Sequence, residues 1–220
     1  MTKTAAIIGG GSLSEDFALR FFEKNTCDYL IAADRGLLVL KKMGIVPTHI
    51  VGDFDSAREE ETRVYRDMSG VEVCRLNPVK DITDTHAALD IAFGLECKKI
   101  FLLGCTGRRL DHTIAAIRDL RFGLAENREC VILDPCNRIR LVNKRMVLRK
   151  KEQYGRYISL FAFGETVRGL TLTGFRYPLN DYDMESVSAL GVSNELTAAE
   201  GIISMKSGTL VVIESKDGEL

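Results

Sequence analysis

Residues 50–56 are Ile-Val-Gly-Asp-Phe-Asp-Ser, an apolar pair typical of a buried strand followed by two aspartates two positions apart. If extended geometry continues, Asp53 and Asp55 point in the same direction, because side chains alternate along a strand. Open α/β sheets bind ligands at the carboxyl ends of their strands, and paired carboxylates there suit a hard cation such as Mg2+. The alternative is an Asp-rich turn in which Asp and Ser side chains cap the next helix.

Strand-like and helix-like segments alternate on both sides of this motif. Strands are expected at 5–8, 29–32, 50–51, 71–76, 100–103 and 131–133, and helices at 14–23, 37–43, around 87–92 and up to about 121. This alternation predicts a mainly parallel sheet with helices on both faces. The N-terminal part is therefore expected to be an α/β domain.

The pattern changes after Asp134-Pro135. The later segments are short, rich in Val, Ile, Thr, Phe and Tyr, and separated by glycines, with the clearest strands at 158–163, 169–172, 201–205 and 209–214. Lys206-Ser207-Gly208 is predicted to be a hairpin connection between the last two strands. We expect an α/β domain over residues 1–136 and an all-β sandwich or barrel-like domain over 137–220.

Composition excludes several classes of protein. The net charge of -1 over 220 residues gives no basic stripe for nucleic acid. No apolar run approaches the roughly 18 residues of a membrane span, and the N-terminus lacks the apolar core of a signal peptide. The six cysteines form no Cys-x-x-Cys and no zinc-like spacing with the three histidines. Reduced thiols in a cytoplasmic protein are expected.

Charged residues gather in the loops that follow the predicted strands, and parallel strands bring such loops to one edge of a sheet. The acids are Asp34, Asp53, Asp55, Asp81, Asp84 and Asp111, and the bases are Arg35, Lys80, Arg108 and Arg109. Grouped carboxylates repel one another unless a cation lies among them. Carboxylates that hold an ion, beside guanidinium groups and backbone N–H groups, suit a metal-bound polyphosphate.

Each of these positions also has a purely structural interpretation. Gly9-Gly10-Gly11-Ser12 is not a complete Gly-x-Gly-x-x-Gly, because position 14 is Ser, so a tight turn competes with a phosphate cradle. Helix capping or a favourable first-turn charge is the alternative for Asp81, Thr83, Asp84, Asp111 and His112. Their common location at one edge favours a site.

The chain resembles the thiamin pyrophosphokinase family over nearly its whole length. The matching motifs, in the family's order and spacing, are Ala33-Asp34-Arg35-Gly36, Gly52-Asp53-Phe54-Asp55-Ser56, Lys80-Asp81-Ile82-Thr83-Asp84-Thr85 and residues 104–112, with 174–179 and 190–196 in the second domain. The resemblance implies Mg2+-dependent transfer of the diphosphoryl group of ATP to the hydroxyethyl oxygen of thiamin, with release of AMP. It also implies a homodimer with thiamin between the α/β domain of one subunit and the sandwich of its partner.

The resemblance also implies roles for individual residues. Metal binding and phosphate ordering fall to Asp53, Asp55, Asp81, Asp84 and Asp111. Arg109 matches the phosphate-contacting arginine, and Ser193 and Asn194 match residues that lie against the aminopyrimidine. We expect the catalytic group to be Asp55, Asp84, Arg109 and Asp111. The remaining residues assigned to substrate binding are Asp34, Arg35, Ser56, Lys80, Thr83, Arg108 and His112.

Four positions depart from the family pattern. Arg35 and Arg108 stand where the family usually has glycine, His86 stands where an acid is common, and Ala116 replaces a common asparagine. The two arginines add cationic bulk beside the expected phosphates. Two other functions stay open: diphosphoryl transfer to another heterocyclic alcohol such as a pterin, and a nucleotide- or thiamin-binding sensor in which Arg35 and Arg108 block turnover.

Overall fold

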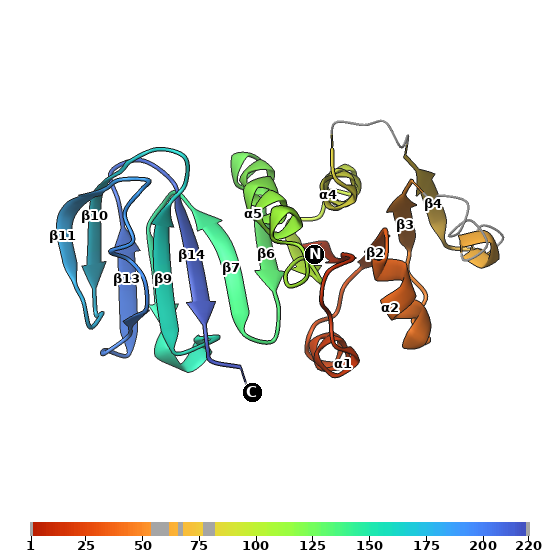
Figure 1. Cartoon of the computed structure of the whole chain (residues 1–220), viewed down its shortest axis with the longest axis horizontal. Coiled ribbons are helices and arrows are strands. Elements are labelled where there is room, and N and C mark those ends of the chain that lie inside the picture. The colour runs from red at the N-terminus through yellow and green to blue at the C-terminus, as the bar shows by residue number, and fades with distance from the viewer. Residues whose placement is uncertain (1, 54–61, 66–67, 77–81, 219–220) are drawn as a thin grey trace. The chain divides into compact units, whose positions relative to one another are not determined.

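The chain divides into two compact units, Met1–Asp134 and Pro135–Leu220. The computed structural model describes residues 2–53, 62–65, 68–76 and 82–218 (Figure 1). The division lies two residues before the boundary expected from the sequence. None of the described helices is long and apolar enough to cross a membrane.

The first unit contains a parallel sheet in the order β6-β5-β1-β2-β3-β4. Its strands are β1 (Thr4–Ile8), β2 (Tyr29–Ala33), β3 (His49–Gly52), β4 (Glu72–Arg75), β5 (Lys99–Leu103) and β6 (Glu129–Leu133). Ile7 lies opposite Ile31 on one side and Leu102 on the other, and all three side chains are fully buried. A central strand covered on both faces has to be apolar at every position, which explains the continuous run Ala5–Ile8.

Helices cover both faces of this sheet. They are α1 (Glu15–Lys24), α2 (Gly36–Lys42), α4 (Asp84–Gly94) and α5 (Leu110–Ala125). Figure 1 shows α1 and α2 on one face and α4 and α5 on the other. Right-handed crossovers require this distribution, because the chain first moves outward from β1 to β4 and later returns to β5 and β6. The predicted α/β fold of the first domain is confirmed.

The sheet has a topological switch point at β1, which lies between β2 and β5. The loops that leave β1 and β5 therefore run to opposite sides, and such a crevice is where open α/β sheets bind ligands. Gly9 N donates to Leu103 O at 2.8 Å, and Gly11 N donates to Gly104 O at 2.6 Å. A Cβ at Gly9 would lie 2.8 Å from the Gly104 carbonyl oxygen, so the two loops approach this closely only because Gly9 has no side chain.

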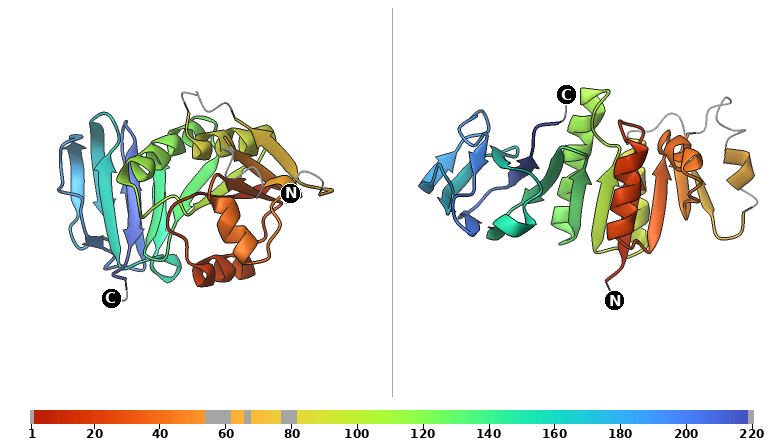
Figure 2. Two further views of the ribbon diagram at one scale, coloured as in Figure 1. Left: turned by 45° about the vertical axis from the view of Figure 1, so that its right-hand side comes forward. Right: turned by 90° about the horizontal axis from the view of Figure 1, so that it is seen from below.

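In the described part of the second unit the regular elements are strands, apart from the short 3-10 helix Lys150–Glu152 (Figure 2). One sheet has the order β12-β9-β14-β7 and the other β11-β10-β13-β8, with antiparallel pairing in both. The strands are β7 (Asn137–Val142), β8 (Met146–Arg149), β9 (Tyr157–Ala162), β10 (Val167–Thr173), β11 (Leu179–Met184), β12 (Asn194–Glu195), β13 (Glu200–Ser204) and β14 (Leu210–Ser215). Ile158, Leu160, Leu170 and Ile203 belong to one buried cluster with residues from both sheets. The predicted all-β sandwich is confirmed.

The predicted hairpin at Lys206-Ser207-Gly208 is wrong. This segment connects β13 to β14, and these strands lie in different sheets. Arg168 N donates to Ser207 O at 3.0 Å and Lys206 N donates to Arg168 O at 2.9 Å, so the connection is tied to β10 instead. A short glycine-containing loop between two apolar runs gives the same sequence signal whether the chain turns back within one sheet or passes to the other.

A fully buried carboxylate links two strands of the second unit. Glu214 on β14 accepts hydrogen bonds from Arg138 Nε at 2.8 Å, from Arg138 Nη2 at 2.6 Å and from Arg140 on β7. Burial alone raises the pKa of Glu214, but the hydrogen bond from Arg138 and the charge of Arg140 outweigh it, so the pKa is lowered. The group therefore stays ionised in the core.

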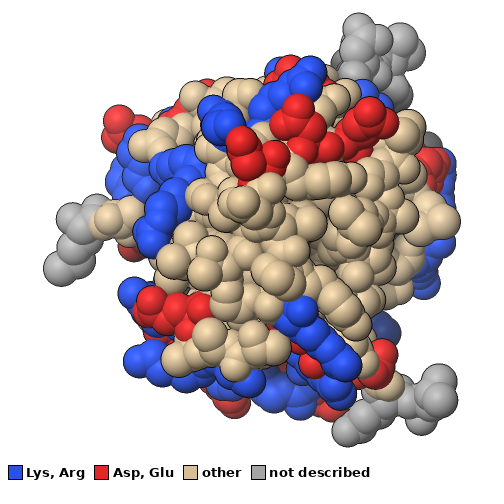
Figure 3. All heavy atoms as spheres, turned by 90° about the vertical axis from the view of Figure 1, so that its left-hand side faces the viewer, with Lys and Arg blue, Asp and Glu red and all other residues tan. Residues whose placement is uncertain are grey.

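The side of the second unit on which β10 and β11 lie carries few charges at its centre. Figure 3 shows a broad area of uncharged side chains there, with lysine, arginine, aspartate and glutamate gathered around it. Large apolar side chains are also exposed between β10 and β12, namely those of Tyr177, Val187, Leu190 and Val192. The second unit therefore exposes large apolar side chains that its hydrophobic core does not bury.

Candidate functional site

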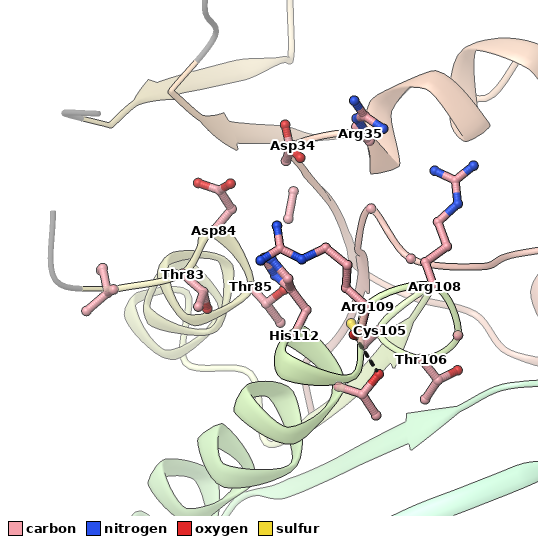
Figure 4. Close-up of a pocket in the computed structure, with 17 residues that line it drawn as sticks. Asp34, Arg35, Thr83, Asp84, Thr85, Cys105, Thr106, Arg108, Arg109 and His112 are labelled. Atoms are coloured by element: carbon pink, nitrogen blue, oxygen red, sulfur yellow. Dashed lines mark hydrogen bonds between the residues drawn. The ribbon is translucent and has the colours of Figure 1, made fainter. Parts of the chain in front are cut away.

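A cavity of about 630 Å3 lies at the switch point of the first unit (Figure 4). It is lined by the loops after β1, β2 and β5 and by the first turns of α4 and α5. Gly10 and Gly11 come from the first loop, and Gly104 and Gly107 from the third. Because glycine has no side chain, the backbone itself forms this part of the cavity wall.

The cavity brings together seven of the residues expected from the sequence. They are Asp34, Arg35, Thr83, Asp84, Arg108, Arg109 and His112. Asp53, at the end of β3, and Asp111, in the first turn of α5, are described but do not line it. Ser193 and Asn194 lie in the second unit. The expectations for Asp55, Ser56, Lys80 and Asp81 lie outside the described residues.

Asp34 and Asp84 are the carboxylates of the cavity wall. Asp34 directly follows β2 with a backbone φ of +49°, and its N–H donates to Val51 O at 2.9 Å. Asp84 is the first residue of α4, and Thr83 caps that helix by accepting a hydrogen bond from His86 N at 3.1 Å. Capping and site formation thus occur together, because the cap fixes the turn that presents Asp84 to the cavity.

Arg109 is paired with Asp111 in this structure. Arg109 Nε donates to Asp111 Oδ1 at 3.1 Å, and Nη2 donates to Oδ2 at 2.5 Å. The hydrogen bond from Arg109 lowers the pKa of Asp111, and the same bond raises the pKa of Arg109. Both side chains are largely exposed, so the pair can open for a ligand at little cost.

Arg35 and Arg108 differ from Arg109 in having no such partner. Within the described ranges, neither guanidinium group forms a hydrogen bond or an ion pair. Figure 4 shows Arg108 on the side of the cavity away from Asp84, with Arg109 and His112 between them. The cavity is therefore lined by both carboxylates and guanidinium groups.

The carboxylate oxygens of the cavity suit Mg2+. This ion prefers oxygen ligands, keeps several waters, and is usually held by one or two carboxylates together with substrate phosphates. Asp34 and Asp84 supply such oxygens. Among the residues that the structure describes, no group of three or more His, Cys, Asp or Glu side chains could hold a metal ion.

Several residues of the site were not assigned from the sequence. Thr85, Cys105, Thr106 and Thr113 also line the cavity. Thr106 Oγ1 donates to Asp134 Oδ2 at 2.8 Å, which holds the loop after β5 against the end of β6. The sequence does indicate Thr106, because this residue lies between Gly104 and Gly107 directly after a predicted strand.

A pair of side chains links the two helices whose first turns line the cavity. His86 Nδ1 and Asp119 Oδ1 are 3.0 Å apart and connect α4 to α5. Burial raises the pKa of Asp119, and the hydrogen bond with His86 opposes that rise. Burial also raises the pKa of the Cys105 thiol to about 12, so this cysteine stays protonated.

The carboxamide of Asn194 forms hydrogen bonds with other residues of the protein. Its Oδ1 accepts from Tyr177 N at 3.0 Å and from Glu195 N at 2.9 Å, and its Nδ2 donates to Tyr177 O at 2.8 Å. The neighbouring Ser193 has a φ of +58° and donates its backbone N–H to Ser159 Oγ at 3.0 Å. Contact of these two side chains with thiamin stays a prediction, and Asn194 is 4% exposed.

Comparison with known proteins matches both units. Residues 23–132 match the model of the thiamin pyrophosphokinase catalytic domain, and residues 145–210 match the model of its vitamin B1 binding domain. Thiamine pyrophosphokinase of Bacillus subtilis (strain 168) is 35% identical over 218 residues, which cover 98% of this chain and 100% of that protein.

Solved structures of related proteins have the same fold as this chain. The crystal structure of thiamine pyrophosphokinase from Bacillus subtilis has a TM-score of 0.85 at 33% identity, covering 98% of this chain and 100% of that one. The thiamin pyrophosphokinase from Geobacillus thermodenitrificans has a TM-score of 0.82 at 32% identity, covering 98% and 99%. Together with the two domain matches, these likenesses show that the chain belongs to the thiamin pyrophosphokinase family.

Proposed function

We propose that this protein transfers the diphosphoryl group of ATP to the hydroxyethyl oxygen of thiamin, giving thiamin diphosphate and AMP. The observation that carries the proposal is the cavity at the switch point, whose lining residues, apart from Gly10 and Gly11, lie within the matched catalytic domain. Carboxylates and guanidinium groups that line one cavity suit a polyphosphate with its metal ion.

The metal ion proposed for this reaction is Mg2+, which neutralises phosphate charge when bound. Asp34 and Asp84 would hold it, with Asp53, Asp55, Asp81 and Asp111 as the further acids expected from the sequence. Glycine N–H groups of the loops after β1 and β5 orient the phosphates. Phosphoryl-type transfer needs mainly positioning and charge neutralisation, so the site requires no strong base.

Arg109 supports the reaction by exchanging its partner. With a nucleotide bound, its guanidinium leaves Asp111 for a phosphate oxygen, since a doubly charged phosphate attracts it more strongly than one exposed carboxylate does. We assign His112 and Thr83 to nucleotide binding as well, with Ser56 and Lys80 as further residues expected from the sequence. Ser193 and Asn194 are proposed to position thiamin, in line with the vitamin B1 binding domain that includes them.

The decisive experiment incubates the purified protein with ATP, Mg2+ and thiamin and resolves the nucleotide products. AMP that appears in equal amount to thiamin diphosphate supports the proposal. ADP with thiamin monophosphate would mean attack at the γ-phosphorus and would overturn it. Bound ATP without product would point to another acceptor, such as a pterin, or to a sensor.

We further propose that the protein works as a homodimer in the cytoplasm. The exposed apolar side chains of Tyr177, Val187, Leu190 and Val192 support a partner surface on the second unit. Six free cysteines support a reducing compartment. Light scattering coupled to size-exclusion chromatography tests the dimer, and a mass near that of one 24.5 kDa chain would contradict it.

A further inference from the structure

Asp119 on α5 is a buried carboxylate that is only half paired. Its side chain is 12% exposed, and its Oδ1 lies 3.0 Å from His86 Nδ1 on α4. The other oxygen, Oδ2, is buried and forms no hydrogen bond within the part of the chain that the structure describes. A buried carboxylate with one oxygen unpaired costs free energy that an apolar side chain of similar shape would not. Stability alone therefore does not account for an aspartate here.

The side chains that favour the ionised form of Asp119 belong to the beginning of α4. Burial raises the pKa of Asp119, and the side chains of His86 and Thr83 both oppose that rise. Thr83 is the residue that caps α4, and its Oγ1 accepts a hydrogen bond from His86 N at 3.1 Å. Asp119 thus interacts with the capping residue and with the residue whose backbone N–H the cap holds.

The imidazole of His86 is held in one orientation by α5. An ionised carboxylate accepts and does not donate, so with Asp119 ionised Nδ1 is the donor of this hydrogen bond. Phe122, one turn further along α5, packs edge-to-face on the imidazole with ring centroids 4.5 Å apart. His86 Nε2 lies 3.8 Å from the exposed carboxylate of Asp90. The beginning of α4 is therefore joined to α5 by a side chain with a defined position.

The same turn of α4 carries Asp84 into the cavity wall. Thr83 and Asp84 both line the cavity, and Figure 4 shows them at the start of α4. The first N–H groups of a helix have no partner within the helix, so its first turn opens more easily than its middle. A carboxylate placed there depends on outside contacts to stay in one position.

We infer that Asp119 is a positioning residue for the proposed transfer: through His86 and Thr83 it holds the first turn of α4, and with it the Asp84 carboxylate, in place at the cavity. The inference rests on the proposed function, in which Asp84 helps to hold Mg2+. Asp119 does not itself line the cavity, so it acts only through these neighbours. Outer partners of this kind orient the groups that bind a metal ion and tune its affinity.

Hydrogen exchange of the free protein, followed by mass spectrometry, measures the first turn of α4 without any ligand. Asp119→Leu keeps the branched shape but removes the acceptor, whereas Asp119→Asn keeps an oxygen for His86 Nδ1. We expect the N–H groups of His86 and Ala87 to exchange roughly tenfold faster in Asp119→Leu and at nearly the wild-type rate in Asp119→Asn. Asp90→Asn is the matched control, because Asp90 lies beside the same imidazole but is exposed, and it should change nothing.

Thermal unfolding separates positioning from folding. Asp119→Leu should unfold at the same temperature as the wild-type protein or higher, because an apolar side chain replaces a half-paired buried carboxylate. If the single variant does not fold, the double variant His86→Leu with Asp119→Leu removes the pair as a whole and provides the same comparison. A stable protein with a loosened first turn is the expected result.

Calorimetry of ATP binding, with Mn2+ and without metal, tests the connection to Asp84. Mn2+ takes the same oxygen ligands as Mg2+. We expect Asp119→Leu to weaken ATP binding roughly tenfold when Mn2+ is present and to leave binding without metal unchanged. Combined with Asp84→Asn, the Asp119→Leu change should cause no further loss, because Asp119 acts through Asp84.

Four results would overturn the inference. The first is an unchanged exchange rate in Asp119→Leu or, if that variant does not fold, in the double variant. The second is an equal effect of Asp90→Asn, which would assign the change to charge around the imidazole. The third is Asp119→Asn behaving as Asp119→Leu does, since the hydrogen bond would then be irrelevant. The fourth is a full additional loss of ATP binding in the Asp84→Asn background.

The same variants separate this inference from the proposed function. If the wild-type protein forms no thiamin diphosphate, but Asp119→Leu loosens the turn and weakens ATP binding with Mn2+, the inference stands and the acceptor is wrong. If Asp119→Leu forms thiamin diphosphate at the wild-type rate, the inference is wrong and the function stands. In steady state Asp119→Leu should need more Mg2+ for its half-maximal rate and have a lowered kcat, with the KM for thiamin unchanged.

Discussion

Replacement of Asn194 by Ala tests whether its carboxamide holds the protein together or contacts thiamin. The side chain is 4% exposed and makes three hydrogen bonds, two from the N–H groups of Tyr177 and Glu195 and one to Tyr177 O. Each such bond contributes about 1 kcal/mol, and buried groups left without a partner cost more. We expect Asn194→Ala to lower the free energy of unfolding by about 2–4 kcal/mol.

Urea unfolding followed by circular dichroism measures this loss as a shift of the midpoint. Asn180→Ala is the matched control, because Asn180 is exposed on β11 and its removal should change stability by less than about 0.5 kcal/mol. Asn194→Asp adds a second check. It keeps the acceptor for the two N–H groups but places an oxygen against Tyr177 O, so it should be destabilised as well.

Thiamin binding by the Asn194 variants completes the experiment. If Asn194 positions thiamin by holding Tyr177 and Glu195 in place, thiamin binding weakens together with stability and recovers where the protein is held folded at low temperature. If Asn194→Ala unfolds at the wild-type urea concentration and yet loses thiamin, the carboxamide contacts the vitamin directly, and the role given to it by the structure is refuted.

Three further predictions concern single side chains. Asp84→Asn should reduce AMP formation by about 100-fold or more with the unfolding temperature nearly unchanged, and activity near that of the wild-type protein would remove Asp84 from the site. Glu214→Gln should destabilise the fold by about 3–5 kcal/mol in urea, because Arg138 and Arg140 lose their buried counter-charge. Since the pKa of Glu214 is lowered in the folded state, its contribution is complete above the unfolded pKa and is lost as the pH falls through the folded pKa, so the variant should lose stability less steeply in acid than the wild-type protein. With a thiol reagent at pH 8, exposed Cys74 should react at once and Cys105, whose pKa is about 12, only on unfolding; mass spectrometry of the labelled peptides checks the order.

The first unit could be predicted from the sequence because its strands are buried on both faces. Ala5–Ile8 and Ile100–Leu103 are continuous apolar runs that end in glycine, and their short length with glycine at the end favours a buried strand over a buried helix. The same reasoning predicts that Asp34, Arg35 and Asp84 lie at one edge of the sheet, and all three line the cavity there.

The parts that could not be predicted depend on partners far apart in the sequence. β7 carries Arg138 and Arg140, which do not suggest a buried strand until Glu214, more than 70 residues later, is known to lie opposite. Likewise, nothing in the sequence indicates that His86 meets Asp119 under the cavity. Local patterns specify elements, whereas ion pairs across elements are set by packing.

The placement of β1 between β2 and β5 has a consequence for synthesis of the chain on the ribosome. Until residues 99–103 have emerged, β1 has a neighbour on only one side, and its fully buried apolar residues form a bare edge. Bare apolar edges pair with other chains, so the nascent protein is open to aggregation until β5 arrives. The loops after β1 and β5, which line the cavity, come together only when β5 pairs with β1. A chain that can bind its ligand has therefore also covered the strand edge that would otherwise pair with other chains.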